Sequence, residues 1–360
     1  MPERAKGIED FIRPELAGFV GYPACKSPDA FEGKRVIKLD ANENNYGASP
    51  RVAGALGSFN GYHIYPDALQ AEIRRALADY TGVPASHIVA GSGSDQLIDL
   101  LVRLFCAPGE EIINLPPTFA MFKFYGDLQG VKVVSVARDE NYQIDVAGIK
   151  KVVSDRTKLI FIANPNNPTG TLIPEKAISE VLELGLPTVV DEAYFEFTGR
   201  TFAPQVGRVP NLMVLRTFSK WAGLAGLRVG YGLFPCRVAD YLHAVRDPYN
   251  VNAAALVAAR ESLRHAASLQ SKVALIVAER ERLYGELTKF GWLKPYPSQA
   301  NFILCRVLRG EARALQAALE ERSILVRYFN SPGLENCLRF SVGLPEEDDI
   351  LLKALREIKT

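Results

Sequence analysis

Apolar and polar positions follow a regular order over the first two thirds of the chain: a short apolar run, then a longer stretch of helical periodicity. The apolar runs that we predict to be strands lie at residues 37–40, 88–90, 111–115, 131–136, 159–163, 188–190, 212–215 and 229–234. The predicted helices between them lie at about 67–77, 96–105, 117–127, 145–154 and 174–184. Continuous apolar strands that alternate with helices are typical of a mostly parallel sheet covered on both faces. We therefore predict an α/β fold with such a sheet in a large domain.

The pattern changes from about residue 236. The predicted elements there are helical stretches at 236–246 and 252–289, strands at 301–306, 324–328 and 337–342, and helices at 311–322 and 346–357. They predict a smaller α+β domain, which we expect the N-terminal arm to complete, with a boundary loop at 295–297. The predicted division is a large domain at 40–250 and a small domain made of 1–39 and 251–360.

The composition agrees with two packed domains, because 48% of the 360 residues are hydrophobic and 23% are charged. The formal net charge of +1 gives no reason to expect a nucleic acid or a membrane as partner. No apolar run approaches the roughly 20 residues that span a bilayer, and the N-terminus has no secretory signal. The five cysteines are scattered without a Cys-x-x-Cys pair, and the four histidines lack ligand spacing. These observations predict a cytoplasmic protein without a disulfide framework or a metal.

Polar clusters follow several of the predicted strands. They lie at residues 91–95, 164–170, 191–194 and 216–220. Ligands of parallel sheets bind beyond the carboxyl ends of the strands. We therefore expect these clusters to meet at one site.

The first cluster, Gly-Ser-Gly-Ser-Asp at 91–95, joins a strand to the start of a helix. Such a loop directs several backbone N–H groups and the positive end of the helix at one point, which favours an anion. Its spacing is neither Gly-x-Gly-x-x-Gly nor a Walker loop, so it implies neither a dinucleotide nor ATP. The alternative is a plain N-cap by Ser94 or Asp95.

The last cluster contains Lys220, which follows Ser219 and precedes Arg228 on a glycine-rich stretch. A lysine in this setting could be a solvated charge, a phosphate ligand, or an amine that forms a Schiff base with a carbonyl cofactor. Its own neighbours do not decide among the three.

The other strand ends favour the Schiff base. An imine between Lys220 and a pyridine aldehyde phosphate needs a carboxylate at the ring nitrogen, and Asp191 ends a strand. Asn167 and Tyr194 can donate to the ring hydroxyl, and Phe119 can cover the ring face. The predicted phosphate ligands are the amides of Ser94 and Asp95, the hydroxyl of Ser219 and the guanidinium of Arg228.

These residues resemble a known family. The segments that carry the resemblance most specifically are 91–96, 116–122, 164–170, 191–197, 216–231 and 337–343, and the resemblance as a whole extends over nearly the whole chain. The sequence is similar to fold-type I pyridoxal-phosphate enzymes and, within them, to the histidinol-phosphate aminotransferase family.

The resemblance implies that Lys220 is the Schiff-base lysine and the acid and base that moves a proton. It implies a homodimer in which Tyr65, of a Tyr-Pro pair, reaches the partner subunit's cofactor phosphate. It also implies that Arg339, helped by Arg327, binds the acidic end of the substrate, and that Tyr22 lies on the substrate side.

The resemblance further implies a cis peptide before Pro168 and supports the cofactor roles given above to Asp191, Tyr194, Asn167, Ser219 and Arg228. The chain departs from the family in two places. Phe119 stands where a tyrosine is frequent, and Gln96 stands where an acidic residue is usual, a change that we interpret as neutral.

The expected activity is transamination between L-histidinol phosphate and 2-oxoglutarate in histidine biosynthesis, in two half-reactions through pyridoxamine phosphate. An aromatic amino acid aminotransferase is the alternative with the same fold. Threonine-phosphate decarboxylase is disfavoured by the segment at 219–228. A non-catalytic pyridoxal-phosphate-binding regulator is disfavoured because the chain has no residues to spare for a DNA-binding domain.

Overall fold

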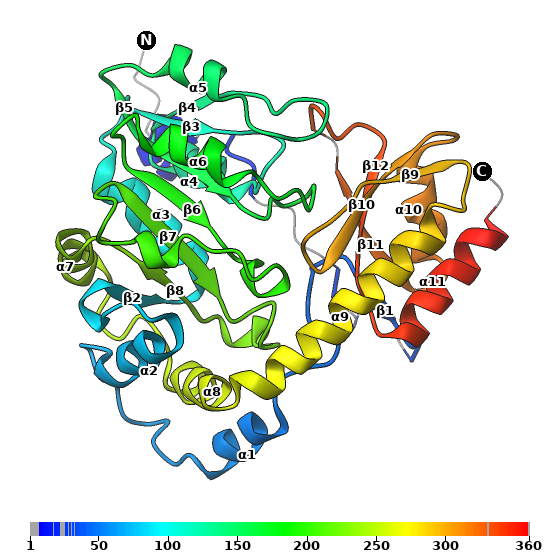
Figure 1. Cartoon of the computed structure of the whole chain (residues 1–360), viewed down its shortest axis with the longest axis horizontal. Helices are drawn as coiled ribbons and strands as arrows, with labels where there is room; N and C mark the ends of the chain where they lie inside the picture. The colour runs from blue at the N-terminus through cyan, green and yellow to red at the C-terminus, as the bar shows by residue number, and fades with distance from the viewer. Residues whose placement is uncertain are drawn as a thin grey trace.

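Two β-sheets organise the chain, and the computed structural model describes residues 7–16, 18–21, 26–27, 29, 31, 33–329 and 331–358. Within this described part, one sheet has seven strands and the other has five. The two sheets lie beside each other, and the long helix α9 (Ala266–Leu287) runs from the large sheet to the small one (Figure 1).

The large sheet has the strand order β2-β8-β7-β6-β5-β3-β4. Its strands are β2 (Ile88–Gly91), β3 (Glu111–Asn114), β4 (Lys132–Ser135), β5 (Thr157–Ala163), β6 (Thr188–Asp191), β7 (Leu212–Thr217) and β8 (Gly230–Leu233). Its pairs are parallel except for the two that β8 makes, with β2 and β7. The prediction of a mostly parallel sheet is confirmed.

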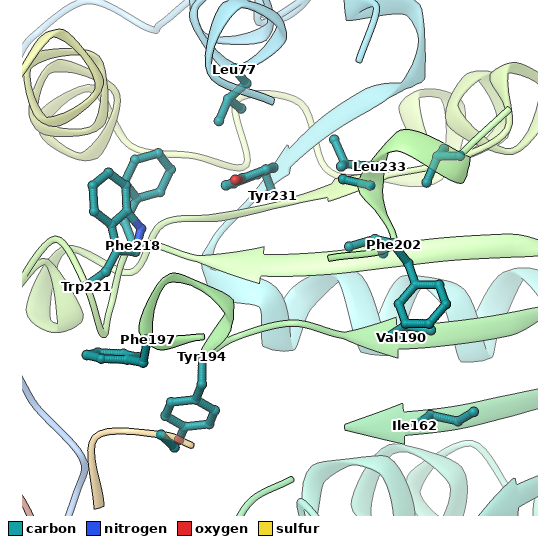
Figure 2. Close-up of a cluster of buried hydrophobic side chains, with 14 of the residues drawn as sticks. Leu77, Ile162, Val190, Tyr194, Phe197, Phe202, Phe218, Trp221, Tyr231 and Leu233 are labelled. Carbon is teal, nitrogen blue, oxygen red and sulfur yellow. The ribbon is translucent and has the colours of Figure 1, made fainter. Parts of the chain in front are cut away.

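Helices cover both faces of the large sheet, which explains why its central strands are continuously apolar. The helices that surround this sheet are α1 (Pro50–Ser58), α2 (Ala71–Thr81), α3 (Gly93–Phe105), α4 (Met121–Leu128), α5 (Val146–Val152), α6 (Glu175–Leu182), α7 (Cys236–Val245) and α8 (Ala253–Arg264). Side chains of α2, α5, α6 and α8 pack into the core on one face, part of which Figure 2 shows. Side chains of α3, α4 and α7 fill the core on the other face.

The small sheet has the order β1-β11-β12-β10-β9. Its strands are β1 (Ile37–Leu39), β9 (Leu293–Pro295), β10 (Phe302–Val307), β11 (Ile324–Phe329) and β12 (Cys337–Ser341), and α10 (Ala312–Glu320) and α11 (Pro345–Glu357) follow in the same lobe. β1 pairs in parallel with β11, whereas the other pairs are antiparallel. The first strand of the chain therefore completes the sheet of its last segment.

The structure differs from the predictions mainly at element ends. Helix α1 was not predicted, although Ser49 caps it by accepting from the Arg51 amide, at 3.4 Å, and Pro50 opens it. The predicted boundary loop at 295–297 overlaps β9, whose Pro295 pairs with β10. Helix α4 begins four residues later than predicted, after two prolines, and the stretch at 252–289 is two helices that part at His265.

The predicted domain limits at residues 40 and 250 stay a prediction. β1 lies in the small sheet, while α8 packs against α1 and α2 beside the large one. In the described part of the chain, no helix is both long enough and apolar enough to cross a membrane.

Candidate active site

A cavity of 380 Å³ lies where the carboxyl ends of β5, β6 and β7 meet the small sheet. Its lining includes these predicted site residues: Ser94, Asp95, Phe119, Asn167, Asp191, Tyr194, Ser219, Lys220, Arg228, Arg327 and Arg339. Segments far apart in the sequence thus meet at one place, as we expected from the rule on parallel strand ends.

Lys220 lies just beyond the end of β7, and its two aromatic neighbours fix the loop. Phe218 and Trp221 are both fully buried (Figure 2). Trp221 stacks on Tyr80 with 5.4 Å between ring centroids. The Nζ of Lys220 donates a hydrogen bond to the carbonyl oxygen of Ala41 at 3.0 Å. Burial, followed by the nearby Arg339 charge, lowers the pKa of Lys220 to about 8. An amine that loses its proton this readily suits nucleophilic attack on a carbonyl.

Asp191 is the last residue of β6 and is buried in the cavity floor. Its Oδ1 accepts a hydrogen bond from the Ala193 amide at 3.0 Å. Burial raises the pKa of Asp191 to about 7, since the carboxylate loses its solvation. A cationic ring N–H placed against this group would restore its charged form.

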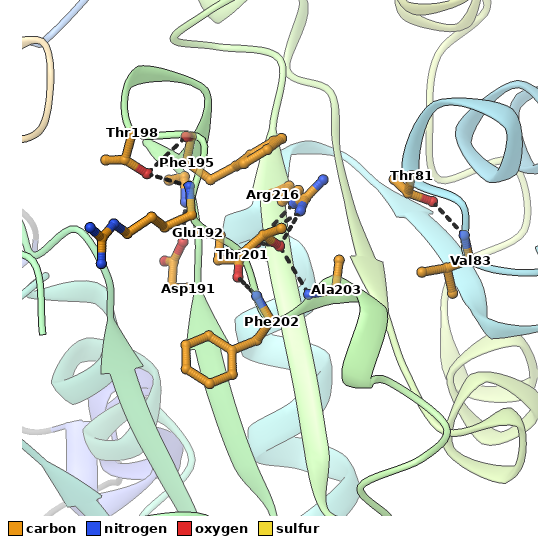
Figure 3. A network of polar contacts seen from close by, with 12 residues as sticks. Thr81, Val83, Asp191, Glu192, Phe195, Thr198, Thr201, Phe202, Ala203 and Arg216 are labelled. Carbon is orange, nitrogen blue, oxygen red and sulfur yellow. Dashed lines mark hydrogen bonds and ion pairs between the residues drawn. The ribbon is translucent and has the colours of Figure 1, made fainter. Parts of the chain in front are cut away.

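A buried ion pair lies next to Asp191, and the sequence analysis did not predict it. Arg216 of β7 donates from Nε to Oε2 of Glu192 at 3.0 Å, and its Nη2 donates to the Thr201 hydroxyl at 2.5 Å (Figure 3). The guanidinium also lies 3.5 Å from the ring centroid of Phe195. The available signal was a pair of opposite charges, Arg216 and Glu192, each of which closely follows a predicted apolar strand.

Two further contacts join the large sheet to the small one at the cavity. Arg339 of β12 donates from Nη1 to Oδ1 of Asn167 at 2.5 Å, while on the small-sheet side its Nη2 donates to the carbonyl oxygen of Asp40, just after β1, at 2.6 Å. Asn42 donates from Nδ2 to the Tyr194 hydroxyl at 2.9 Å. The peptide between Asn167 and Pro168 is cis, which confirms that prediction.

The start of α3 forms the predicted anion-binding loop, and glycine is required there. A Cβ on Gly230 would lie 2.5 Å from the Ser94 amide nitrogen, and a Cβ on Gly93 would lie 2.6 Å from Nη2 of Arg228. The same Nη2 lies 2.7 Å from Oδ2 of Asp95. The first amides of α3 and the Arg228 guanidinium therefore lie together at a helix N-terminus, an arrangement that favours an anion.

Gln96 contributes to this loop as a hydrogen-bond acceptor, a role that the acidic residue usual at this position could also fill, so the interpretation of the change as neutral stays a prediction. Its Oε1 accepts from the Ser92 amide at 2.8 Å and from Nδ2 of Asn250 at 2.7 Å. Asn250 was not considered from the sequence, because nothing in its local pattern points to a loop so far away in the chain.

Two predicted residues are not assigned to the cavity: Tyr65, which was predicted to reach the partner subunit's cofactor, and Tyr22. Tyr65 is 77% exposed, stacks on Tyr249 with 4.5 Å between centroids, and lines a second hollow of 270 Å³. Tyr22 lies outside the residues that the structure describes.

The residues of the cavity fit pyridoxal phosphate. Each part of that molecule has a matching group in the cavity. The lysine whose pKa is lowered suits the aldehyde, the buried acid whose pKa is raised suits the ring nitrogen, and the remaining groups are donors for the ring oxygen and an anion-binding loop. Within the described ranges, no group of three histidine, cysteine or acidic side chains could hold a metal.

This combination of fold and cavity defines a fold-type I pyridoxal-phosphate enzyme. The chain belongs to the aminotransferase class I and II family, whose profile matches residues 34–355. It is 60% identical over 352 residues to a histidinol-phosphate aminotransferase of Dehalococcoides mccartyi, covering 98% of both chains. It is 45% identical to the histidinol-phosphate aminotransferase of Roseiflexus castenholzii, over 99% of this chain and 100% of the relative.

A solved structure is similar over the whole fold. The histidinol-phosphate aminotransferase of Sinorhizobium meliloti in complex with pyridoxal-5'-phosphate superposes with a TM-score of 0.88, at 27% identity, over 96% of this chain and 97% of that one. An L-threonine-O-3-phosphate decarboxylase of Porphyromonas gingivalis has a TM-score of 0.79 at 23% identity over 89% of this chain and 98% of that one, which shows a shared fold alone.

Proposed function

We propose that this chain transfers the amino group of L-histidinol phosphate to 2-oxoglutarate, giving imidazole-acetol phosphate and glutamate. The relatives at 45% and 60% identity support this choice of substrates. The observation that carries it is the pair Arg327 and Arg339, which lie directly opposite each other on β11 and β12 and both line the cavity. Two guanidinium groups that border the same cavity suit an anionic ligand.

Two arginines at one end of the cavity suit both half-reactions. A guanidinium binds a carboxylate or a phosphate with two parallel hydrogen bonds. Arg339 and Arg327 can therefore accept the distal carboxylate of glutamate in one half-reaction and the phosphate of histidinol phosphate in the other.

The cofactor roles that we propose follow the positions in the cavity. When bound, pyridoxal phosphate supplies a carbonyl for the amino group and a ring that withdraws electrons. Asp191 would hold the ring nitrogen, Tyr194 and Asn167 the ring oxygen, and Phe119 the ring face. The phosphate would be bound by the amides of Ser94 and Asp95, the hydroxyl of Ser219 and the guanidinium of Arg228.

Lys220 would carry the proton. In the cofactor-free protein, burial lowers the pKa of Lys220 to about 8. With cofactor and substrate bound, Nζ would accept a proton from the substrate carbon and return it on the cofactor side. Positioned proton transfer of this kind contributes roughly 10²- to 10⁴-fold to rate. The hydrogen bond from Nζ to Ala41 shows that the side chain reaches across the cavity toward the small sheet.

We also propose that the protein is a homodimer in which Tyr65 of the partner subunit contacts the cofactor phosphate. The exposed side chains Tyr62, Ile64, Tyr65 and Leu69 lie close together in the chain, at and beside the second hollow, and give an apolar surface for a second copy. Light scattering after size exclusion tests the assembly. Tyr65→Phe should weaken cofactor binding, whereas the exposed Tyr241 on α7, changed to Phe, should not.

The proposed location is the cytoplasm. It is supported by Cys106, Cys236, Cys305 and Cys337, which form no disulfide among the described residues.

The deciding experiment compares amino donors with 2-oxoglutarate as acceptor. The proposal expects kcat/KM for histidinol phosphate to exceed that for phenylalanine, tyrosine and unphosphorylated histidinol. A higher kcat/KM for the aromatic amino acids would identify an aromatic aminotransferase instead. Release of carbon dioxide from threonine phosphate would indicate the decarboxylase, and a protein that binds the cofactor without turnover would indicate a regulator.

A further inference from the structure

Asn42 occupies an unusual position between the two sheets. It follows β1, lines the cavity, and is only 1% exposed. Its φ of 53° lies in the left-handed region, which few residues other than glycine adopt. A buried residue with such a backbone persists only where its surroundings hold it, and such residues gather at functional sites.

Side chains of the small sheet hold Asn42 from two sides. Its backbone N–H donates to Oγ of Ser341 at 2.9 Å, and its carbonyl oxygen accepts from Nδ2 of Asn301 at 3.0 Å. Oγ of Ser341 in turn lies 3.1 Å from Oδ1 of Asn42. The Asn42 backbone and one end of its amide are therefore fixed to the small sheet.

These contacts determine which way the amide of Asn42 points. The Ser341 hydroxyl accepts from the Asn42 backbone N–H and donates its own proton to the amide oxygen Oδ1. The other amide atom is then Nδ2, a donor, and it faces the Tyr194 hydroxyl at 2.9 Å. The Tyr194 oxygen is an acceptor in this contact, and its own O–H must point away from Asn42.

We propose that Asn42 is a positioning residue that directs the O–H of Tyr194 toward the ring oxygen of the bound cofactor. This inference rests on the cofactor role proposed above for Tyr194, and it explains why the O–H of Tyr194 points toward the cofactor. The ring of Tyr194 is itself held edge-on against Phe302, with 5.2 Å between centroids, which fixes the position of the hydroxyl oxygen. Because the contacts of Asn42 come from β12 and the residue before β10, the small sheet sets this proton's direction.

A purely structural role for Asn42 makes a different prediction. If only the left-handed backbone mattered, glycine would serve as well, because glycine adopts positive φ without strain. Asn42→Gly keeps that backbone and removes the donor. Asn42→Asp keeps the shape and replaces the donor with an acceptor, which would draw the Tyr194 proton toward itself.

The test is a pH titration of the visible absorbance of the purified holoenzyme. If the ring oxygen of the bound cofactor loses the hydrogen bond from Tyr194, that oxygen becomes more basic. It then keeps its proton to higher pH, and the midpoint of the titration rises. We expect the midpoint to rise by about one pH unit or more in Asn42→Asp, and by less in Asn42→Gly. We also expect kcat with histidinol phosphate to fall roughly tenfold in Asn42→Asp, with a smaller change in KM. Binding of the cofactor to the apoprotein, followed by fluorescence, should weaken in both variants.

Asn336→Asp is the matched control. Asn336 also has a positive φ, of 57°, and donates from Nδ2 to the carbonyl oxygens of Val307 and Gly310, but it is not part of the cavity lining. The control should lower stability and leave the midpoint unchanged. Wild-type midpoints in both Asn42 variants would overturn the inference, even if stability falls. A wild-type protein that binds no cofactor would instead overturn the proposed function.

Discussion

The Nζ of Lys220 donates to the carbonyl oxygen of Ala41, so the end of a central strand of the large sheet is tied to the segment that follows β1. The amine is held in a place where its charge is poorly solvated. Burial lowers its pKa from an ordinary 10.5 to about 8. Charging this lysine therefore costs stability in the cofactor-free protein.

The first prediction concerns cofactor-free Lys220→Met. A lowered lysine pKa destabilises the folded state below about pH 8, and the cost disappears as pH rises from about 8 to 10.5. Because the amine borders a cavity that water can enter, we expect the variant to be more stable than wild type at pH 7 by only about 1–2 kcal/mol. Urea unfolding at a series of pH values measures the difference, and Lys220→Met should also abolish turnover. A difference that does not shrink above pH 10 would contradict this account.

The second prediction concerns Asp191. In the folded state the pKa of Asp191 is raised from 3.8 to about 7. The folded state therefore keeps its full stability below about pH 3.8 and loses stability as pH rises from 3.8 through 7, because the carboxyl group ionises more readily in the unfolded chain. Cofactor-free Asp191→Asn should therefore gain thermal stability relative to wild type between pH 5 and pH 8, while its affinity for the cofactor falls. The exposed Asp247, changed to Asn, serves as the control and should show no such gain. Parallel melting curves for Asp191→Asn and wild type across this range would count against a buried, poorly solvated carboxylate.

The third prediction tests the substrate end of the cavity. Arg339→Lys keeps the charge but cannot make two parallel hydrogen bonds to an anion. We expect kcat/KM for histidinol phosphate to fall by about 2–4 kcal/mol in transition-state terms, or roughly 30- to 1000-fold. Arg309→Lys, at an exposed position outside the cavity, should leave the rate unchanged. Steady-state kinetics with both half-reaction substrates provide the measurement, and an unaltered Arg339→Lys enzyme would remove this residue from the site.

The fourth prediction concerns the buried pair Glu192 and Arg216. Arg216→Met leaves a carboxylate buried without its counter-charge, which typically costs about 3–5 kcal/mol. Adding Glu192→Gln should recover a large part of that loss. Arg103→Met, which breaks an exposed pair with Asp99 on α3, should cost less than about 1 kcal/mol. Equilibrium unfolding of the single and double variants gives the coupling energy, and a coupling near zero would show that the pair does not act as a unit.

The sequence predicted those parts of the site that depend on local pattern. Apolar runs marked the strands, and the rule that ligands bind at parallel strand ends placed Asp191, Asn167 and Lys220 at one expected site. Lys220 alone was ambiguous, and its assignment came from residues on other strands.

Contacts between distant segments could not be predicted in the same way. The hydrogen bonds of Asn42 with Tyr194 and with Ser341 join positions separated by more than a hundred residues, and nothing in the local pattern at Asn42 points to either partner. The bond from Asn250 to Gln96 is of the same kind. Such contacts depend on how the two sheets are placed, which periodicity does not describe. The antiparallel direction of β8 could not be predicted either, because its apolar run has the same pattern as that of a parallel strand.

The parallel pairing of β1 with β11 has a consequence for synthesis on the ribosome. β1 emerges early, but its partner in the small sheet emerges only near the end of translation. The large sheet can therefore assemble while β1 still lacks its neighbour, because domains form as their residues leave the exit tunnel. The segment after β1, with Ala41 and Asn42, reaches its place only when β11 and β12 have been made. A nascent chain would thus contain most of the cofactor pocket well before it could catalyse a reaction. Catalytic activity would require the last strands of the small sheet.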